Sequence, residues 1–204
     1  FNRLLSSAIS VYGDPGFNVD KISSRPKEIQ TTINKKKYHL ITEPKEIDDW
    51  IKEAEQLGEV AVDTETSSLD PHQADLIGVS LSTKIGKACY IPIGHNSKKS
   101  INRDLVLKKL KPMLEDSSIK KIGQNIKFDF IVLFKHGINI SSMEDTMLMS
   151  YVLDAGKNRH NMDTLAEIHL EHKTIAFKDL VGTGKKEINF REVDIEKAKD
   201  YAAE

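Results

Sequence analysis

The spacing of hydrophobic residues changes along the chain and predicts both strands and helices. Short apolar or alternating runs are typical of strands, and they occur at 38–41, 60–63, 76–82, 88–93 and 119–123. Apolar residues at helical spacing predict helices at 46–57, 103–114, from about 125, 144–153, 162–170 and from about 194 to the end. The second, third and fourth strands are joined by connections short enough for antiparallel pairing. The order of these elements predicts an α/β domain with a mixed sheet.

The first 37 residues differ in character from the rest. They contain a turn signal at Asp14-Pro15-Gly16, a cluster of breakers at Ser23-Ser24-Arg25-Pro26 and a charged run at Lys35-Lys36-Lys37. We interpret residues 1–37 as a linker with a short helix at its start, and residues 38–204 as the compact domain. Because the chain begins with Phe1 and not with Met, we also expect that it was cut from a longer protein.

Composition narrows the class of protein. With 204 residues, of which 39% are hydrophobic and 30% charged, the chain can bury one good-sized core. A single cysteine, Cys89, excludes an intrachain disulfide and fits a reducing cytoplasm. The sequence has no long apolar run and no signal-peptide pattern, so we expect neither a membrane span nor export. The net charge of -1 gives no overall attraction for nucleic acid, so any such contact must be local or must pass through bound metal.

The strongest chemical signal is a pair of carboxylates at the end of the second predicted strand. Side chains two residues apart in a strand point to the same face, so Asp63 and Glu65 would project together. Two like charges are costly there unless a divalent cation lies between them, and carboxylate oxygens suit Mg2+ or Mn2+. The alternative is that Asp63 opens a turn and Glu65 is solvated.

A second group of residues follows the last predicted strand. Gly123 allows a sharp turn, Asn125 is a good N-cap, and Asp129 lies four residues later on the same side of the helix. Asp129 could therefore face the strand ends from which Asp63 and Glu65 emerge, at the edge where α/β sheets bind ligands. The alternative is that Asp129 only complements the helix dipole.

The end of the chain carries a third candidate. Asp194 is typical of an N-cap, and Tyr201 follows on the predicted terminal helix. The alternative for Tyr201 is a core residue whose hydroxyl finds a partner. Asp145 and Asp163 each precede an apolar helical run and are also predicted as N-caps.

In this order, Asp63-x-Glu65, Asn125-x-x-x-Asp129 and Tyr201 resemble the three motifs of the DEDD exonuclease superfamily, tyrosine subclass. From about residue 38 to its end, the chain resembles the 3'-5' exonuclease (proofreading) domain of bacterial DNA polymerase I. The blocks that carry the resemblance are 62–70, 122–129, 145–148, 159–166 and 201–204. The resemblance implies a ribonuclease H-like fold, with a mixed five-stranded sheet flanked by helices. It also implies an activity, which is the removal of nucleotides from a DNA 3' end.

The resemblance also implies roles for the acidic residues and the tyrosine. Asp63 would bridge two Mg2+ or Mn2+ ions, Glu65 would bind the tighter one, Asp129 would hold the second, and Tyr201 would orient the attacking water. The family pattern has a fourth carboxylate at position 205, so we expect that the domain is truncated at its C-terminus. With three carboxylates, this chain is expected to hold one ion or none.

Substrate contacts are implied by position. The resemblance assigns Thr66, Leu69, Gln124, Asn125, Arg159 and Phe177 to the single-stranded DNA 3' end, with Leu69 as a wedge between bases and Phe177 as a stacking ring. The alternatives are core packing for Leu69 and Phe177, capping for Asn125 and simple solvation for Gln124 and Arg159. The lysine pairs at 98–99, 120–121 and 185–186 are expected on solvated faces.

Three functions remain open at this point. The first is a metal-dependent DNA exonuclease that serves a polymerase domain of the same parent chain. The second is an RNA 3' exonuclease similar to ribonuclease D. The third is a non-catalytic module that binds 3' ends.

Overall fold

The computed structural model describes Ser10 and residues 38–204. The predicted linker over 1–37 therefore lies, apart from Ser10, outside the described residues. The domain boundary at residue 38 stays a prediction.

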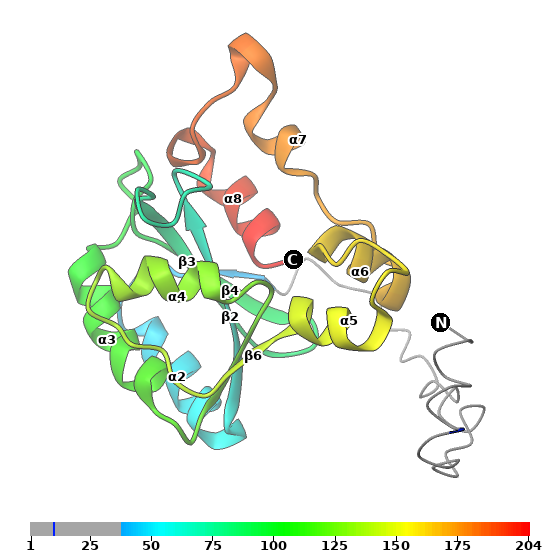
Figure 1. Cartoon of the computed structure of the whole chain (residues 1–204). Helices are drawn as coiled ribbons and strands as arrows, with labels where there is room; N and C mark the ends of the chain where they lie inside the picture. Colours follow the sequence, from blue (N-terminus) through cyan, green and yellow to red (C-terminus); the bar gives the residue numbers. More distant parts are fainter. Residues whose placement is uncertain (1–9, 11–37) are drawn as a thin grey trace. The chain divides into compact units, whose positions relative to one another are not determined.

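Six strands form one mixed sheet in the described part of the chain (Figure 1). Their order across the sheet is β1-β4-β3-β2-β5-β6. The strands are β1 (His39–Leu40), β2 (Glu59–Thr66), β3 (Leu76–Lys84), β4 (Lys87–Pro92), β5 (Lys120–Gly123) and β6 (Met143–Asp145). β3 pairs antiparallel with β2 and β4, whereas β1, β5 and β6 run parallel to their neighbours. The predicted mixed sheet is confirmed, but it has six strands and not five.

The additional strand is β6, which pairs parallel with β5 from Lys121–Met143 to Gly123–Asp145. The pattern predicted a helix over 144–153, whereas helix α5 begins at Thr146. Three residues are too few to display the alternation that identifies a strand, and the cap at Asp145 is itself a helix signal.

Helices surround the sheet in the described part of the chain. They are α2 (Glu46–Leu57), α3 (Arg103–Glu115), α4 (Lys127–Phe134), α5 (Thr146–Asp154), α6 (Met162–Leu170), α7 (Phe177–Val181) and α8 (Ile195–Ala202), with 3-10 turns η3 (Gly184–Lys186) and η4 (Phe190–Glu192). One apolar cluster joins α2, α3 and α4 to the sheet, and a second joins α7, η4 and α8 to residues of β3 and β4. Figure 1 shows α8 beside β3 and β4, and α5 and α6 as a pair next to the C-terminus. Among the described residues, every helix falls short of the length or the hydrophobicity that a membrane span requires.

The predicted N-caps are only partly confirmed. Asp145 caps α5 and Asp194 caps α8, each through backbone N–H groups of the first turn. Asp163 is not a cap, because α6 begins one residue earlier with Asn161 at the cap position, and Asp163 accepts a hydrogen bond from the Thr174 hydroxyl. Asn125 is not a cap either, since Ile126 occupies the cap position of α4.

One lysine of the predicted solvated pairs is buried. The side chain of Lys121 lies inside the domain, where Nζ donates to the carbonyl oxygens of Asp116 and Ile119 at 2.6 Å each. The turn at 116–119 supplies these carbonyl groups, which solvate the ammonium in place of water. The sequence pattern does not reveal this, because the carbonyl partners belong to the backbone.

Candidate active site

Three acidic side chains come together where β2 ends. Asp63 is partly buried, while Glu65 and Asp129 are only 9% and 2% exposed. Asp63 and Glu65 alternate along β2 with Thr64, as the strand period requires. Asp129 arrives from the first turn of α4. The predicted convergence of these residues is thus seen in the structure, although it does not by itself assign them a role.

Asp129 is fixed to β2 by two hydrogen bonds. Its Oδ1 accepts from the backbone N–H of Thr64 at 2.8 Å and from the Thr64 hydroxyl at 2.6 Å. The parallel ladder between β2 and β5 runs from Glu59–Lys120 to Ala61–Ile122, so Thr64 lies beyond its end. Asp129 therefore takes the place of a strand partner, because a buried N–H needs an acceptor. This contact anchors its carboxylate between the positions of Asp63 and Glu65.

Burial and mutual repulsion disfavour the ionised forms of these three groups. Burial, and then the negative charge of Asp129, raises the pKa of Glu65 to about 8. The pKa of Asp63 is also raised, by burial first and then by the charges of Asp129 and Glu65. Burial raises the pKa of Asp129 to about 6, even though its hydrogen bonds from Thr64 oppose the shift. The site therefore favours any cation that can compensate this clustered charge.

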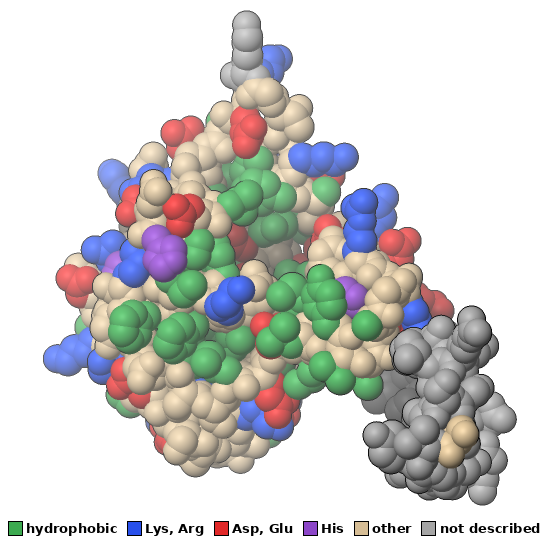
Figure 2. All heavy atoms as spheres, in the orientation of Figure 1, with side chains coloured by type: hydrophobic (Ala, Val, Ile, Leu, Met, Phe, Trp, Pro, Cys, Tyr) green, Lys and Arg blue, Asp and Glu red, His purple; other side chains and the backbone are tan. Residues whose placement is uncertain are grey.

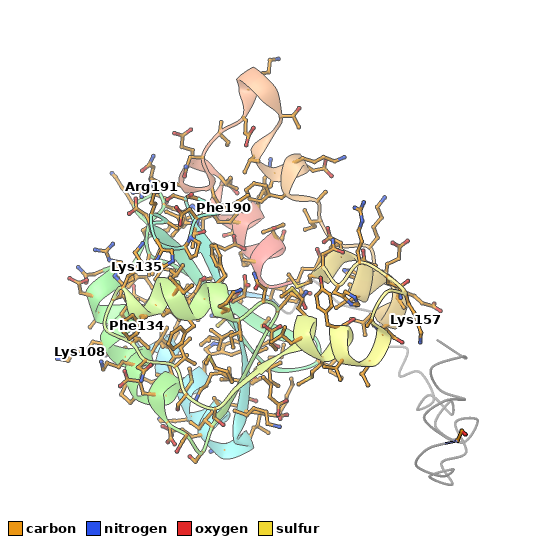
Figure 3. All side chains as sticks on the ribbon, viewed as in Figure 1. Lys108, Phe134, Lys135, Lys157, Phe190 and Arg191 are labelled. Carbon is orange, nitrogen blue, oxygen red and sulfur yellow. The ribbon has the colours of Figure 1, made fainter. Side chains whose placement is uncertain are left out.

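Tyr201 faces the same carboxylates from α8. Burial raises the pKa of its phenol, and the charges of Glu65 and Asp63 raise it further. Its ring packs against two phenylalanine rings, with centroids 6.0 Å from Phe177 and 6.1 Å from Phe190. Figure 3 shows Phe190 beside α8. Tyr201 is thus held by packing on its ring while its hydroxyl stays near the acidic group.

Phe190 is a residue of this site that sequence reasoning missed. It is buried, and it also stacks on Phe177 at 6.2 Å with the two rings nearly parallel. Neither the motif spacing nor the helical period of the chain points to it, because it lies in the short turn η4. Thr64 was missed as well, although its position between the two carboxylates could have suggested it.

Tyr90 lies beneath the acidic group and explains a glycine in β3. Gly78 pairs with Glu65 across the sheet, and a Cβ at Gly78 would collide with the Tyr90 ring and hydroxyl. Tyr90 is fully buried, and its hydroxyl shares a hydrogen bond of 2.7 Å with His95 Nε2. The glycine therefore makes room for an aromatic ring directly beside the Glu65 position.

The residues predicted to contact substrate have different surroundings. Leu69 is 95% exposed in the loop after β2, which excludes core packing. Phe177 is half exposed, and its ring stacks on Phe190 and packs against Tyr201. Arg159 is exposed, and Thr66 ends β2 with its hydroxyl donating to the Ser68 carbonyl.

Gln124 and Asn125 form the turn between β5 and α4. Gln124 is not simply solvated, because its Nε2 donates to the His160 carbonyl at 2.7 Å and its Oε1 accepts from the Thr146 hydroxyl at 2.6 Å. Asn125 adopts the left-handed conformation, with φ of 57°, which asparagine tolerates better than most residues.

The donor chemistry fits a divalent cation. Within the described residues, no three His, Cys, Asp or Glu side chains are grouped closely enough to form a metal site as they stand. Asp63, Glu65 and Asp129 nevertheless share one buried region, where the charge of Asp129 raises the pKa of the other two carboxyl groups. Carboxylate oxygens are the donors that Mg2+ and Mn2+ prefer.

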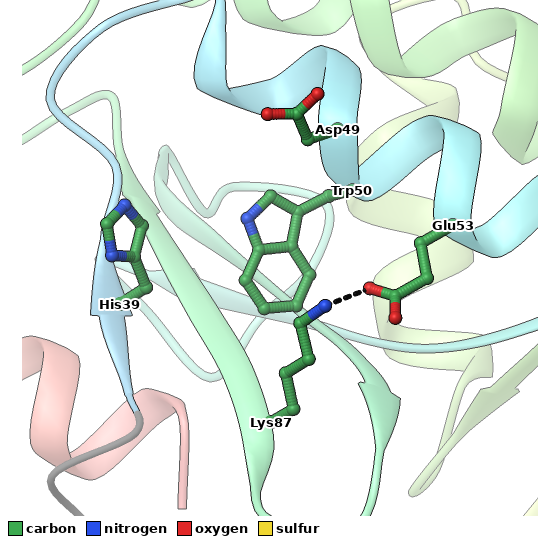
Figure 4. A pocket seen from close by; sticks show the side chains of 5 residues that line it. All are labelled: His39, Asp49, Trp50, Glu53 and Lys87. Atoms are coloured by element: carbon green, nitrogen blue, oxygen red, sulfur yellow. Dashed lines mark hydrogen bonds and ion pairs between the residues drawn. The ribbon is translucent and has the colours of Figure 1, made fainter.

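A separate cavity of about 320 Å³ lies among α2, β1 and β4 and is lined by His39, Asp49, Trp50, Glu53 and Lys87 (Figure 4). Its main charges already have partners. Lys87 forms an ion pair with Glu53 and lies 5.2 Å from the centre of the Trp50 ring, and His39 bonds Glu46. None of the predicted site residues lines this cavity, so we do not assign the activity to it.

A ribonuclease H-like sheet with acidic side chains at the end of a central strand defines a DEDD-type nuclease domain. Residues 38–204 match the 3'-5' exonuclease family along their whole length. The chain belongs to this 3'-5' exonuclease family and is homologous to the exonuclease region of bacterial DNA polymerase I.

Known relatives agree with this assignment. The chain is 42% identical over 173 residues to DNA polymerase I of Pseudomonas aeruginosa, covering 82% of this chain and 19% of the relative. It is 43% identical over 179 residues to DNA polymerase I of Rhizobium leguminosarum, covering 78% and 18%. The chain thus spans about a fifth of the length of these polymerases and corresponds to their exonuclease region alone.

Solved structures share the fold. Brucella melitensis NrnC with bound Mg2+ is 28% identical and superposes with a TM-score of 0.56, over 81% of this chain and 71% of that chain. The catalytic core of RRP6 from Trypanosoma brucei, at 12% identity, has a TM-score of 0.64 over 91% of this chain and 48% of that chain. The second likeness concerns the fold alone.

Proposed function

We propose that this chain is the proofreading domain of a bacterial DNA polymerase I, a metal-dependent exonuclease that hydrolyses 3'-terminal nucleotides of DNA. The observation that carries the proposal is the anchoring of Asp129 to Thr64, between Asp63 and Glu65. The identity with polymerase I sequences supports it, as does the Mg2+ bound by the related NrnC.

In this proposal Asp63, Glu65 and Asp129 hold the metal. When bound, two divalent cations supply an activated water and stabilise the negative charge on the phosphate and on the leaving 3' oxygen. The three carboxylates neutralise only part of the charge of two cations, so we propose that a fourth carboxylate follows Glu204 in the parent protein.

Tyr201 orients the attacking water in this mechanism. Its pKa is raised by burial and by the neighbouring carboxylates, so the phenol keeps its proton at neutral pH. Tyr201 therefore acts through hydrogen bonding and not as a base. The water attacks the terminal phosphorus, the bond to the preceding 3' oxygen breaks, and a 5'-mononucleotide leaves.

The proposed substrate is a single-stranded DNA 3' end. Phe177 stacks on the terminal bases, because its ring is half exposed and can be reached by them. Leu69 inserts between the bases, because its side chain is almost fully exposed. Thr66, Gln124, Asn125 and Arg159 contact the strand and its phosphates. The proposed partner is the polymerase domain of the same parent chain, in the cytoplasm.

A ribonuclease D-like activity on RNA is the second candidate, because that enzyme shares the DEDD motifs. The two polymerase relatives named above are 42% and 43% identical to this chain, which favours DNA. A non-catalytic module that binds 3' ends would keep the fold but would release no nucleotide.

The test is release of 5'-mononucleotides from labelled single-stranded DNA and RNA of the same sequence, with Mg2+, with Mn2+ and with chelator. It is run on the chain as it stands and on a version extended by one further helical turn that includes the expected aspartate. We expect weak activity in the first and full activity on DNA in the second. In the extended version, Tyr201→Phe should slow turnover by about 100-fold or more with little change in DNA affinity.

Preference for RNA would select the ribonuclease D-like alternative. No metal-dependent release from the extended version would select the non-catalytic one. An unchanged rate in Tyr201→Phe would make Tyr201 a packing residue.

A further inference from the structure

Asp145 holds two helix N-termini that are distant in sequence. Its Oδ1 accepts from Met147 N–H at 2.9 Å and Leu148 N–H at 3.3 Å, which is the ordinary cap of α5. Its carboxylate also accepts from Asn125 N–H at 3.0 Å and Ile126 N–H at 3.1 Å, at the start of α4. A helix cap requires only the first pair. The second pair ties α4 to the strand β6.

The segment held by this second pair is the turn that leads into α4. Asn125 in this turn has a left-handed backbone, which is less favourable for a residue other than glycine and needs support. Strand pairing places Gly123 opposite Asp145, and the Thr146 hydroxyl donates to the Gly123 carbonyl at 3.2 Å. The turn is therefore fixed from one side by β6 and by the first residue of α5.

The turn decides where Asp129 points. Asp129 lies only three residues after Ile126, within the first turn of α4, so any rotation of the helix start displaces its carboxylate. Its two bonds to Thr64 exist only if α4 begins at this position and in this orientation.

We propose that Asp145 is a positioning residue of the exonuclease site, which holds the start of α4 so that Asp129 reaches Thr64 between Asp63 and Glu65. The inference rests on the proposed function in so far as Asp129 binds metal. Asp145 itself touches neither metal nor substrate in this scheme. It acts as the partner that orients a ligand, and removal of such partners typically weakens metal binding by about 10- to 100-fold.

Two variants and a control separate positioning from simple capping. Asp145→Ala removes all four bonds. Asp145→Asn can keep its Oδ1 on the α5 amides while presenting an amide N–H to Ile126, so it weakens the hold on α4 selectively. Asn102→Ala removes the cap of α3, where Asn102 accepts from Leu105 N–H at 3.0 Å, and α3 carries no site residue.

The first measurement is hydrogen exchange at the Thr64 amide in the metal-free chain, followed by NMR. We expect exchange to accelerate by about tenfold or more in Asp145→Ala, and measurably in Asp145→Asn, relative to the amides of β3 in the same sample. Asn102→Ala should keep the Thr64 amide as protected as in the parent. The second measurement is Mn2+ affinity by electron paramagnetic resonance, on the version of the chain extended past Glu204 and carrying the same substitutions. It should fall about 10- to 100-fold in Asp145→Ala and remain unchanged in Asn102→Ala.

These readouts distinguish the two hypotheses. If the extended version with Asp145 intact binds no Mn2+, the proposed metal site fails, while Thr64 exchange still decides whether Asp145 positions Asp129. If Thr64 stays protected in both Asp145 variants, the positioning role is wrong. Should Asp145→Ala not fold, Asp145→Asn alone carries the test, and parental Thr64 exchange in that variant overturns the proposal.

Discussion

At the scale of single residues, Asp129 combines a structural contact with an electrostatic cost. Its bonds to Thr64 stabilise the junction of α4 and β2, while its charge raises the pKa of Asp63 and Glu65. Asparagine can keep the oxygen that accepts from Thr64 and removes the charge. Asp129→Asn therefore separates the two effects better than alanine, which would leave a buried N–H without an acceptor.

The pH dependence of metal-free stability follows from these pKa values. A carboxyl whose pKa is higher in the folded than in the unfolded state binds extra protons when folded. Its contribution to the free energy of unfolding is greatest below the unfolded pKa of about 4 and is lost as pH rises through the folded pKa. For Glu65 and Asp129 the folded values are about 8 and about 6, so the loss occurs between about pH 4 and pH 8.

We predict that Asp129→Asn reduces this loss. In chelator at pH 8 the variant should be more stable than the parent by about 1 kcal/mol or more, or about 2–4 °C in melting temperature. At pH 5 the difference should shrink. Mg2+ should raise the melting temperature of the parent more at pH 8 than at pH 5, and should raise that of the variant less. Thermal melts at both pH values check this, and equal pH profiles for the two proteins would show that Asp129 does not repel its neighbours.

The sequence predicts the acidic residues but not how they are held. The strand period places Asp63 and Glu65 together, and the spacing after Gly123 brings Asp129 toward them. The contact with Thr64 depends on where β5 stops pairing, which is decided by tertiary structure. Phe190 likewise has no signal in the sequence, because its role arises only when α7, η4 and α8 pack together.

At the scale of elements, helix α8 brings Tyr201 to the site. Its N-cap is Asp194, which accepts from Glu196 N–H at 3.1 Å and Lys197 N–H at 3.2 Å. Its far end is tied down as well, since the Glu204 carboxylate accepts from Ile175 N–H at 2.6 Å and bonds His172 Nε2 at 2.9 Å. The Glu204 side chain is buried and hydrogen-bonded, so it links the end of α8 to the segment 172–175.

We predict that Asp194→Ala destabilises the domain by about 1 kcal/mol, since it leaves the amides of the first turn of α8 without their acceptor. Urea unfolding followed by circular dichroism measures this loss. Asp194→Asn, which can still cap, is the matched control and should lose only a fraction of it. A loss below about 0.3 kcal/mol in Asp194→Ala would show that the packing of α8 and the bonds of Glu204 hold the helix without its cap.

Element boundaries show which signals in the sequence are reliable. The helix over 46–57 was predicted at its observed bounds, because it has strong apolar periodicity and ends at a glycine with positive φ. The prediction of helix at 144–145 is wrong, because the strand character of these residues comes from pairing with β5 and not from their own side chains. Local periodicity therefore predicts elements that bury a face, whereas short strands at the sheet edge depend on their neighbours.

At the scale of the whole molecule, the described surface carries an apolar groove of about 760 Å³. It lies between α4, β6 and α5 and is lined mainly by Ile126, Phe130, Met143, Leu148, Met149, Val152 and Leu153. Figure 2 shows hydrophobic side chains gathered over this face. None of the residues of α5 is buried, and Val152 and Leu153 are 84% and 78% exposed. Apolar patches of this kind promote association in solution.

We predict that the double substitution Val152→Lys with Leu153→Lys reduces self-association of the chain without loss of stability. Neither side chain is buried, so the free energy of unfolding should change by less than about 0.5 kcal/mol. Two cations in the last turn of α5, which has none of its own, also complement the negative end of the helix dipole.

Ile85→Lys is the control, because Ile85 is 72% exposed in the β3–β4 turn and outside the groove. Self-association is measured by sedimentation velocity across a concentration series, and exposed apolar surface by the binding of an apolar fluorescent dye. Both should fall in the double variant and stay near the parent values in the control. Equal decreases in both proteins would mean that added positive charge, and not the groove, governs association.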